Sequence, residues 1–347
     1  MIIKKPIFMV ERPKFEVILN GMPIKHEECS VELNAFDETD NFTVKALWNI
    51  GGTDVLSSNA TTDTVLISKK DVPVQIKLNG KLLIDGIMDV PEWSFGMDGD
   101  LVTITGRGKI GRLIDRKILR NIKNRTASSL MLEIFAYHKL KPLVTATTKK
   151  VGTYSEDNQT SSVDMDDWEL SNWLAEWEGF VVRVKGTEGF FGPLDQIPEL
   201  KLPPIPFTHG SNCEVQSISR HQFGAREVII EGRSYHGKRT IVEYYPRKPK
   251  KKDETAIIFR RTLTSLSQEQ LRTRVRSIYQ ELTKYNISGN LTIPYFIEID
   301  TDRRLSLYGV GKGLSQDYFC TNVKYSENAD SFNTEIGFSS KFKEVEG

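Results

Sequence analysis

The 347-residue sequence has no surplus of either charge. It contains 47 Lys and Arg residues against 46 Asp and Glu, a formal net charge of +1. Proteins that wrap nucleic acid normally have a basic excess, because neutralised phosphates supply most of their affinity. The overall balance therefore argues against a dedicated nucleic-acid-binding protein. Hydrophobic residues make up 39% and charged residues 27% of the chain, which is typical of folded globular proteins and argues against wholesale disorder.

Cysteine is scarce, and long apolar runs are missing. The three cysteines, Cys29, Cys213 and Cys320, show no CxxC spacing, which excludes a zinc knuckle and a disulfide framework. We expect small buried thiols in a reducing compartment. The first residues lack the apolar core of a signal peptide, and no run approaches the roughly 20 apolar residues of a membrane helix. The sequence predicts a soluble protein made in a cytoplasm, without a membrane partner.

The motifs of common enzymes are missing too. The five histidines are scattered, in no HxxxH or HExxH arrangement: His26, His138, His209, His221 and His236. There is no GxSxG nucleophile elbow. We therefore assign no catalytic, cofactor-binding or metal-binding residue, and we expect neither enzymatic activity nor a cofactor.

Two acidic groups are candidates for a metal-binding or catalytic site. The group Asp164, Asp166, Asp167 and Glu169 lacks the spacing of a calcium loop and fits the N-terminal end of a helix, where negative charge is favourable. Glu176 and Glu178 stand two apart on the same predicted helix and cannot face each other as a glycosidase pair.

Glycine-rich segments raise the question of a nucleotide site. Residues 106–111 form a literal GxGxxG, which in a dinucleotide site lets the backbone approach a pyrophosphate. The preceding strand alternates polar and apolar residues, and no β-α-β repeat follows. We interpret the segment as a flexible turn leaving the first domain. Residues 309–313 lack the Lys-Ser/Thr ending of a P-loop and predict a tight turn between strands.

Residues 1–105 have the pattern of short antiparallel strands. Alternating apolar residues lead into Asn20-Gly21 and Asn79-Gly80, the strongest short signal for a hairpin. Three further alternating segments are 30–33, 42–47 and 101–105. Strands this short and close predict an antiparallel barrel or sandwich.

Residues 106–205 change to helical spacing and predict a small α/β unit. Apolar residues recur on one face over Thr126–His138 and again over Asp166–Glu178. The second helix has a capping-box pair, Asp166 and Glu169, and a stop at Gly179. Trp168, Trp173 and Trp177 on this helix are predicted core residues. A hairpin turning at Lys185-Gly186 follows, and a proline-rich stretch ends the unit.

Residues 206–347 return to strands. Strand patterns cover 213–218 and 226–231, and strands resume from Gly289. A basic loop at 246–253 and a helix at 267–285, with a capping box from Ser267 and Gln270, interrupt them. The basic loop fits a solvated connection better than a contact with DNA or an acidic partner. The hairpin plan of Ile87–Gly106 recurs at Phe319–Phe338, which leaves a duplicated β-domain as an open possibility.

Several patches resemble the baseplate hub proteins of contractile phage-type tails, a tail hub or late control protein D-like family related to the N-terminal part of type VI secretion spike proteins. The patches are Thr105–Gly108 running through Gly111–Asp115, Asn124–Ser128 with the helix that ends in Tyr137–Leu143, and Trp173–Phe180. The order of elements fits over nearly the whole chain.

The resemblance implies a mainly β, α+β fold. It has two tube-like antiparallel β-barrels (1–105 and 206–347), an intervening small α/β domain (106–205) and a helical insertion in the second barrel. It also implies a homotrimer that forms a pseudo-sixfold ring. Its implied partners are a hexameric tail tube or tube-initiator protein, a trimeric central spike and other baseplate proteins. DNA would only pass through the lumen, and the protein would belong to the tail baseplate of a virion, made in the host bacterial cytoplasm.

Two other functions stay open at the level of sequence. A glycan-binding or glycan-degrading tail protein would expose a stripe of Trp and Tyr, or would face two carboxylates across a cleft. A barrel that binds single-stranded nucleic acid would align aromatic and basic side chains along one groove.

Overall fold

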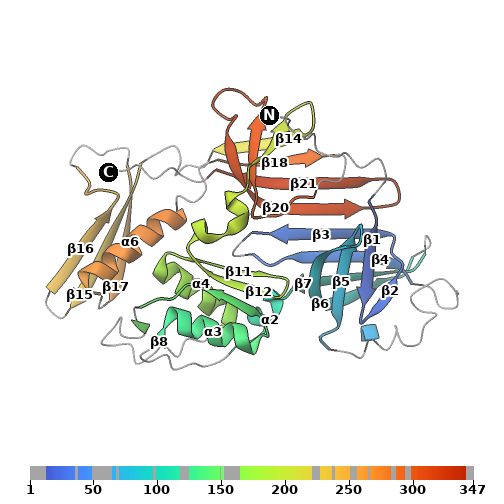
Figure 1. Ribbon diagram of the computed structural model, residues 1–347, viewed down its shortest axis with the longest axis horizontal. Coiled ribbons are helices and arrows are strands. Elements are labelled where there is room, and N and C mark those ends of the chain that lie inside the picture. Colours follow the sequence, from blue (N-terminus) through green and yellow to red (C-terminus); the bar gives the residue numbers. More distant parts are fainter. Residues whose placement is uncertain are drawn as a thin grey trace.

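The computed structural model describes residues 13–35, 38–48, 65–67, 70–96, 99–117, 125–148, 150–151, 165–220, 227–236, 239–250, 256–264, 266–282, 287–293 and 298–340. Over these residues the molecule is mainly β (Figure 1). The mainly β, α+β class predicted from the sequence is confirmed. No described helix is long and apolar enough to cross a membrane.

The first strands form the N-terminal strand group, which consists of β1 (Phe15–Leu19), β2 (Met22–Ile24), β3 (Glu28–Asn34), β4 (Asn41–Leu47), β5 (Pro73–Leu78), β6 (Lys81–Ser94) and β7 (Leu101–Gly108). Buried and exposed residues alternate along them, as in β1 and β7. Both predicted Asn-Gly hairpins are present, with positive φ at Asn20-Gly21 and Asn79-Gly80. Local turn chemistry therefore determines the two tightest connections of this group.

The last strands form the C-terminal strand group, which consists of β13 (Ile205–Thr208), β14 (Glu214–Arg220), β18 (Ile287–Ile293), β19 (Arg304–Tyr308), β20 (Asp317–Glu327) and β21 (Phe332–Ser339). Between β19 and β20, Gly309 and Gly311 adopt positive φ. The turn predicted at residues 309–313 is thus confirmed.

The two strand groups belong to one 13-stranded sheet (Figure 1). Its order is β14-β18-β21-β20-β3-β4-β7-β6-β5-β1-β2, with β13 and β19 attached beside β20. A single apolar core lies under both groups and includes Val31, Val44, Ile104, Val323 and Ile336. In the described part of the chain this path is linear and does not close on itself.

The α/β unit lies between the strand groups in sequence. It consists of α2 (Ile110–Ile114), β8 (Arg125–Thr126), α3 (Ala127–Tyr137), β9 (Lys141–Val144), β10 (Lys150–Val151), α4 (Asp167–Glu178), β11 (Val181–Lys185), β12 (Glu188–Gly192) and the 3-10 turns η2 (Leu194–Gln196) and η3 (Pro198–Lys201). The hairpin predicted to turn at Lys185-Gly186 is present as β11 and β12, and β12 also pairs in parallel with β9.

Capping residues determine where the two longer helices of this unit begin and end. At the start of α3 the Thr126 hydroxyl accepts a hydrogen bond from the backbone amide of Ser129. Asp166 and Glu169 form the predicted capping box of α4, and Gly179 ends that helix in the left-handed conformation. Both helices therefore match the sequence prediction to within one residue.

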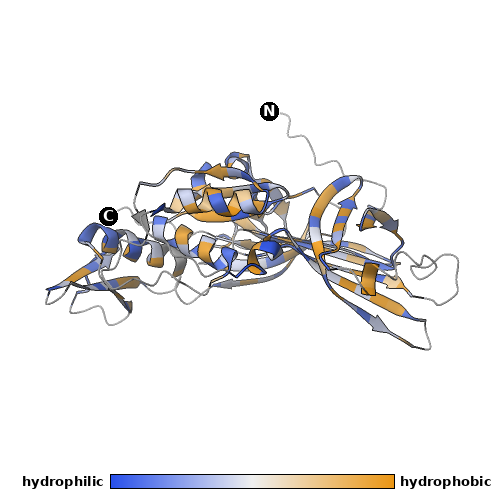
Figure 2. Cartoon of the chain, turned by 90° about the horizontal axis from the view of Figure 1, so that it is seen from below, coloured by the Kyte–Doolittle hydropathy of each residue, from blue (hydrophilic) through white to orange (hydrophobic). Residues whose placement is uncertain are grey.

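An outer layer follows β14 in sequence. It consists of β15 (Val228–His236), β16 (Arg239–Tyr245), β17 (Ile257–Thr264) and α6 (Gln268–Leu282). The three strands form a separate sheet in the order β16-β15-β17, which we call the outer sheet. In Figure 2 it forms the end of the molecule opposite the N-terminal strand group. The predicted helix is present, and Ser267 and Gln270 form its capping box.

The outer layer shares a core with the α/β unit. Leu271 and Val275 of α6 belong to the same buried cluster as Leu130 of α3 and Leu174 of α4. Arg274 of α6 bonds Glu176 of α4 at 2.8 Å. The segment that interrupts the C-terminal strands in sequence thus packs in space on the α/β unit.

The interpretation of residues 106–111 as a flexible turn is wrong. Gly106 and Gly108 lie within β7, and α2 begins at Ile110. A Cβ at Gly106 would lie 2.2 Å from Phe42 Cζ and 2.3 Å from the Ile87 carbonyl oxygen. The glycine is required by close packing between strands and leaves no room for a phosphate.

Candidate functional site

The two strand groups meet along one antiparallel strand pair, β3 with β20, which we call the seam. Asn34 lies opposite Asn322 at one end and Cys29 opposite Glu327 at the other. The Asn322 amide donates to Glu32 Oε1 across the seam at 3.1 Å. Because β3 and β20 are 290 residues apart in sequence, the seam makes the first and last parts of the chain one continuous sheet.

On either side of the seam the sheet repeats one strand order. The C-terminal run is β14-β18-β21-β20, and the N-terminal run is β3-β4-β7-β6. In both runs the third and fourth strands are a sequential hairpin, β20 to β21 and β6 to β7. These are the Phe319–Phe338 and Ile87–Gly106 segments whose shared plan is visible in the sequence.

Individual residues of the two runs correspond. Cys320 pairs with Phe338, and Met88 pairs with Gly106. Both hairpins have a bulge directly after these pairs, between Cys320 and Asn322 and between Met88 and Pro91. Bulges are specific structural features, so their matching positions align the runs residue by residue.

Each run also contains one Phe packed over one Gly, with the two positions exchanged. In the N-terminal run Phe42 of β4 lies opposite Gly106 of β7. In the C-terminal run Gly289 of β18 lies opposite Phe338 of β21. A Cβ at Gly289 would lie 2.6 Å from Phe338 Cζ. The same space is filled by an aromatic ring from opposite strands.

Both ends of this eight-strand path have open edges. At one end β14 pairs with β18 alone among the described strands. At the other end residues 91–94 of β6 pair with β7 alone among the described strands, because β5 covers only residues 81–87. Val90 is 68% exposed, and Phe95, just past the strand, is 67% exposed. Open strand edges beside exposed apolar side chains are typical of surfaces that bind another chain.

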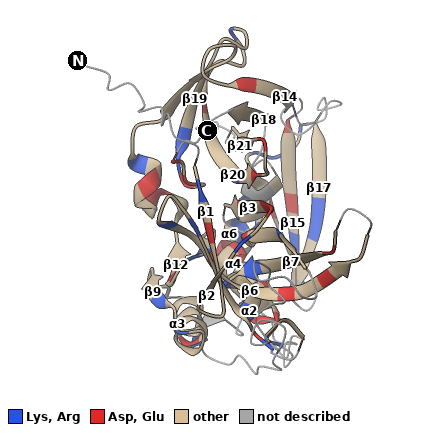
Figure 3. Cartoon of the chain, turned by 90° about the vertical axis from the view of Figure 1, so that its right-hand side faces the viewer, with Lys and Arg blue, Asp and Glu red and all other residues tan. Residues whose placement is uncertain are grey.

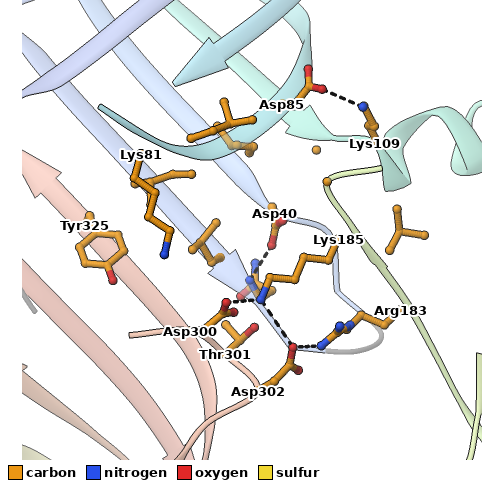
Figure 4. A pocket seen from close by; sticks show the side chains of 18 of the residues that line it. Asp40, Lys81, Asp85, Lys109, Arg183, Lys185, Asp300, Thr301, Asp302 and Tyr325 are labelled. Carbon is orange, nitrogen blue, oxygen red and sulfur yellow. Dashed lines mark hydrogen bonds and ion pairs between the residues drawn. The ribbon is translucent and has the colours of Figure 1, made fainter. Parts of the chain in front are cut away.

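Behind the seam, where both strand groups meet the α/β unit, lies the junction pocket of about 200 Å³. Charged side chains of both signs line it (Figure 4). Charged residues are likewise interspersed over the view in Figure 3. The pocket has no single-sign surface that would select an anion or a cation.

Ion pairs across the pocket connect the three parts of the molecule. Arg183 of β11 pairs with Asp302, which is fully buried and precedes β19. Lys185, also on β11, pairs with Asp300 and lies 3.8 Å from Asp302. Lys109 pairs with Asp85 at 2.7 Å. Of these pairs Arg183–Asp302 is the buried one, and it favours one geometry, because either partner alone would be an uncompensated charge.

Asp40 faces the same pairs from the N-terminal strand group (Figure 4). The Asn34 amide donates to its carboxylate at 2.8 Å. Burial, with a smaller contribution from the Asp300 carboxylate, raises the pKa of Asp40 to about 6, although Asn34, Lys185 and Arg183 act in the opposite direction. Asp40 is therefore a partly buried acid whose charge is only partly compensated.

The three cysteines are buried and free, as the sequence predicts. Burial raises the pKa of the Cys29 and Cys320 thiols, and it raises the pKa of Cys213 to about 11. Since the thiolate is the reactive form, these thiols are poor nucleophiles.

The candidate acidic residues of the sequence analysis that the structure describes form structural contacts. Asp166 caps α4, and Asp167 bonds Arg116 and His138 at 2.9 and 2.8 Å. Asp164 lies outside the described residues. Glu176 accepts from Arg274. The described residues contain no group of three or more His, Cys, Asp or Glu side chains that could hold a metal ion.

The predicted core tryptophans and the basic loop can also be placed. Trp168 is buried, and Trp173 and Trp177 pack partly buried against the same core. In the described part of the basic loop, Arg247 pairs with Glu227, and Lys248 lies over the Tyr244 ring at 6.0 Å. Residues 251–253 of the predicted loop lie outside the described residues.

Sequence reasoning missed the seam, the open edges and the junction pocket. The ion pairs join Arg183 to Asp302 and Lys185 to Asp300, more than 100 residues apart. The alternation of charged and apolar residues at 182–185 shows only that Arg183 and Lys185 share a face of a strand.

Solved structures with the same fold are tail proteins. The tail protein from Neisseria meningitidis MC58 matches with a TM-score of 0.72 at 14% identity, over 95% of this chain and 97% of its own. The 43 kDa tail protein of prophage MuSo2 from Shewanella oneidensis matches with a TM-score of 0.69 at 13% identity, over 94% and 98%. The chain has the fold of phage tail proteins.

A further match is the E. coli c3393 protein, a component of the type VI secretion system that is structurally similar to the T4 bacteriophage tail proteins gp27 and gp5. Its TM-score is 0.59 at 8% identity, over 94% of this chain and 77% of its own. No protein-family model and no curated protein matches the sequence. The hub resemblance noted in the sequence is thus confirmed at the level of fold.

Proposed function

We propose that this chain is the structural hub of a contractile-tail baseplate. Three copies form a pseudo-sixfold ring, in which each strand group supplies one tube-like β-barrel. The ring joins the hexameric tail tube, or its initiator protein, to the trimeric central spike, and other baseplate proteins surround it. The role is structural rather than enzymatic, and the protein is part of the virion.

The observation that carries the proposal is the repeated strand order on the two sides of the seam. Within one chain, β20 ends one run and pairs with β3, which begins the other. By the same equivalence, β6 ends the N-terminal run and is matched to β14, which begins the C-terminal run of a neighbouring chain. Among the described strands, β14 pairs with β18 alone and residues 91–94 of β6 pair with β7 alone. A head-to-tail contact of this type produces a ring when the rotation closes.

The alignment of the two runs also gives the register of the contact. Ser326 pairs with Ser30 across the seam. Ser94 corresponds to Ser326, because Ser94–Leu101 and Ser326–Asn333 are equivalent pairs. Ser217 corresponds to Ser30, because each pairs with the equivalent residue of the second strand, Asn290 or Thr43. We therefore expect Ser94 of one chain opposite Ser217 of the next.

The face of the sheet that points away from the common core suits a lumen. On the N-terminal run it presents Ser30 and Glu32 of β3 and Thr43 and Lys45 of β4, which alternate with buried Val31 and Val44. Polar side chains of mixed charge would let DNA pass without retaining it, since retention needs a basic surface.

Light scattering on the purified chain, alone and mixed with its spike protein, tests the trimer. The proposal predicts a mass near three times the 39.5 kDa of one chain, alone or once the spike protein is added. A chain that stays monomeric in both samples would refute the trimer, and with it the ring.

A further inference from the structure

The outer sheet has one covered face and one open face. Gly232 faces α6 so closely that a Cβ there would lie 2.2 Å from Val275 Cγ2. Because strand residues alternate between faces, Glu231, Arg233 and Tyr235 of β15 point to the opposite side. There Tyr235 is 43% and Val242 of β16 38% exposed. The helix thus covers one face of the sheet, and the opposite face exposes Tyr235 and Val242 although Ile229 on it is buried.

An arginine pair lies at the centre of the open face. The register places Tyr244 and Arg260 on either side of Glu231. Glu231 accepts from Arg233 at 2.6 Å and from Arg260 at 3.2 Å. Burial favours the neutral carboxyl, but the two guanidinium bonds outweigh it and hold the pKa of Glu231 below its ordinary value. Two positive groups thus share one negative charge.

The surrounding segment is basic although the chain as a whole is balanced. Residues 227–264 contain ten Lys and Arg against five Asp and Glu, an excess of five, in a chain of net charge +1. On the right of Figure 3 part of the β17 ribbon has the colour of Lys and Arg. On the open face itself Arg233 and Arg260 share the single carboxylate of Glu231, and the net positive charge of this cluster complements an acidic surface.

The composition of the face indicates a protein partner. Exposed Tyr and Arg beside apolar Val242 and Ile258 are the residue types enriched at the centres of protein interfaces. The remaining N–H donors of Arg233 and Arg260 can bind carboxylates of such a partner bidentately.

We propose that the open face of the outer sheet, centred on the Arg233–Glu231–Arg260 cluster, is a docking surface for a second tail protein that presents Asp or Glu side chains beside an apolar residue. The inference rests on the proposed role in a tail, because it takes the partner from the same particle. It does not depend on the trimer.

The test places a photo-crosslinking amino acid at Val242 in assembled tails and maps the crosslinked peptide by mass spectrometry. The expected adduct is with a peptide of a different protein that contains Asp or Glu. Arg260→Ala should lower the adduct yield at least about tenfold, the size of an effect near 1.4 kcal/mol. Arg272→Ala, on α6, is the matched control, since its side chain is equally exposed at 71% against 69%, and it should leave the yield unchanged.

Four results would overturn the proposal. They are an adduct with DNA, an adduct with another copy of this chain, an adduct with a peptide that lacks acidic residues, and no adduct in tails that contain the chain. Absence of the chain from tails would instead contradict the proposed function, so the two failures are distinguishable.

Discussion

At the scale of single residues, the exchanged Phe and Gly positions show how one sheet geometry is built from two unrelated sequences. Phe42 over Gly106 and Phe338 over Gly289 fill the same space from opposite strands. An aromatic ring over a strand glycine supplies the apolar contact that the glycine lacks. Residue identity between the runs is poor because the constraint acts on the pair and not on either position.

Gly106→Ala should destabilise the fold by about 2–3 kcal/mol, since overpacking a tight contact costs this much. The new Cβ would meet both the Phe42 ring and the backbone oxygen of Ile87. Urea unfolding measures the change. Gly96→Ala is the control, because the nearest atom to its Cβ is 3.9 Å away. Equal stability of the two variants would contradict the packing account.

Asp40 gives the junction pocket a pH dependence. Its pKa of about 6 in the folded chain exceeds the ordinary 3.8, so the folded state binds the proton more tightly than the unfolded state. The contribution of protonated Asp40 to the stability of the folded state is therefore complete below about pH 4 and is lost as the pH rises through about 6.

Asp40→Asn, which cannot ionise, should raise the melting temperature at pH 7 and leave it nearly unchanged at pH 4. Thermal unfolding followed by circular dichroism at both pH values measures this. A variant that is less stable than the parent chain at pH 7 would show that the Asp40 charge is favourable in the pocket.

At the scale of elements, the sequence predicted what local chemistry determines. Asn20-Gly21 and Asn79-Gly80 specify their hairpins, and the Asp166–Glu169 capping box specifies the start of α4. The α2 helix was missed, because it begins two residues after Gly108 and its five residues are too few to show a helical period. Elements bounded by their own turn or capping residues are predictable from sequence. Short elements that depend on contacts with neighbouring strands are not.

Arg183 holds the β11–β12 hairpin to the junction pocket through its ion pair with Asp302. The Arg183→Met variant measures how much this pair contributes to the free energy of unfolding. The change leaves buried Asp302 without its main partner, and breaking a buried pair typically costs about 3–5 kcal/mol. Urea unfolding should show a loss of that size, and the double variant Arg183→Met/Asp302→Leu should lose less.

Lys141→Met is the matched control. Its partner Glu188 lies on the same hairpin, but both side chains are exposed, so the loss should stay within about 1 kcal/mol. A similar loss for Arg183→Met and Lys141→Met would show that burial of the pair adds nothing.

At the scale of the whole molecule, long-range pairing determines the arrangement. The β3–β20 seam and the Arg183–Asp302 and Lys185–Asp300 pairs join segments that are 100 to 300 residues apart, and the sequence of one chain does not specify such partners. The packing of the outer layer on the α/β unit was equally invisible, since an amphipathic helix does not identify the face it will cover. The predicted domain boundaries stay predictions, because one core runs under both strand groups.

The repeated strand order makes the ring a geometric prediction, which a pair of cysteines can test most directly. Ser94→Cys/Ser217→Cys should form disulfides only between chains, because paired strand residues have the Cα separation that a disulfide needs. Ser30→Cys/Ser326→Cys, the equivalent pair across the seam, should close within one chain and serves as the positive control. The buried native thiols do not compete.

Non-reducing electrophoresis after mild oxidation of assembled tails gives the result. The account predicts a band of three covalently joined chains for Ser94→Cys/Ser217→Cys and a single-chain band for the control. Only single chains from the Ser94 and Ser217 variant, while the control closes fully, would contradict the ring.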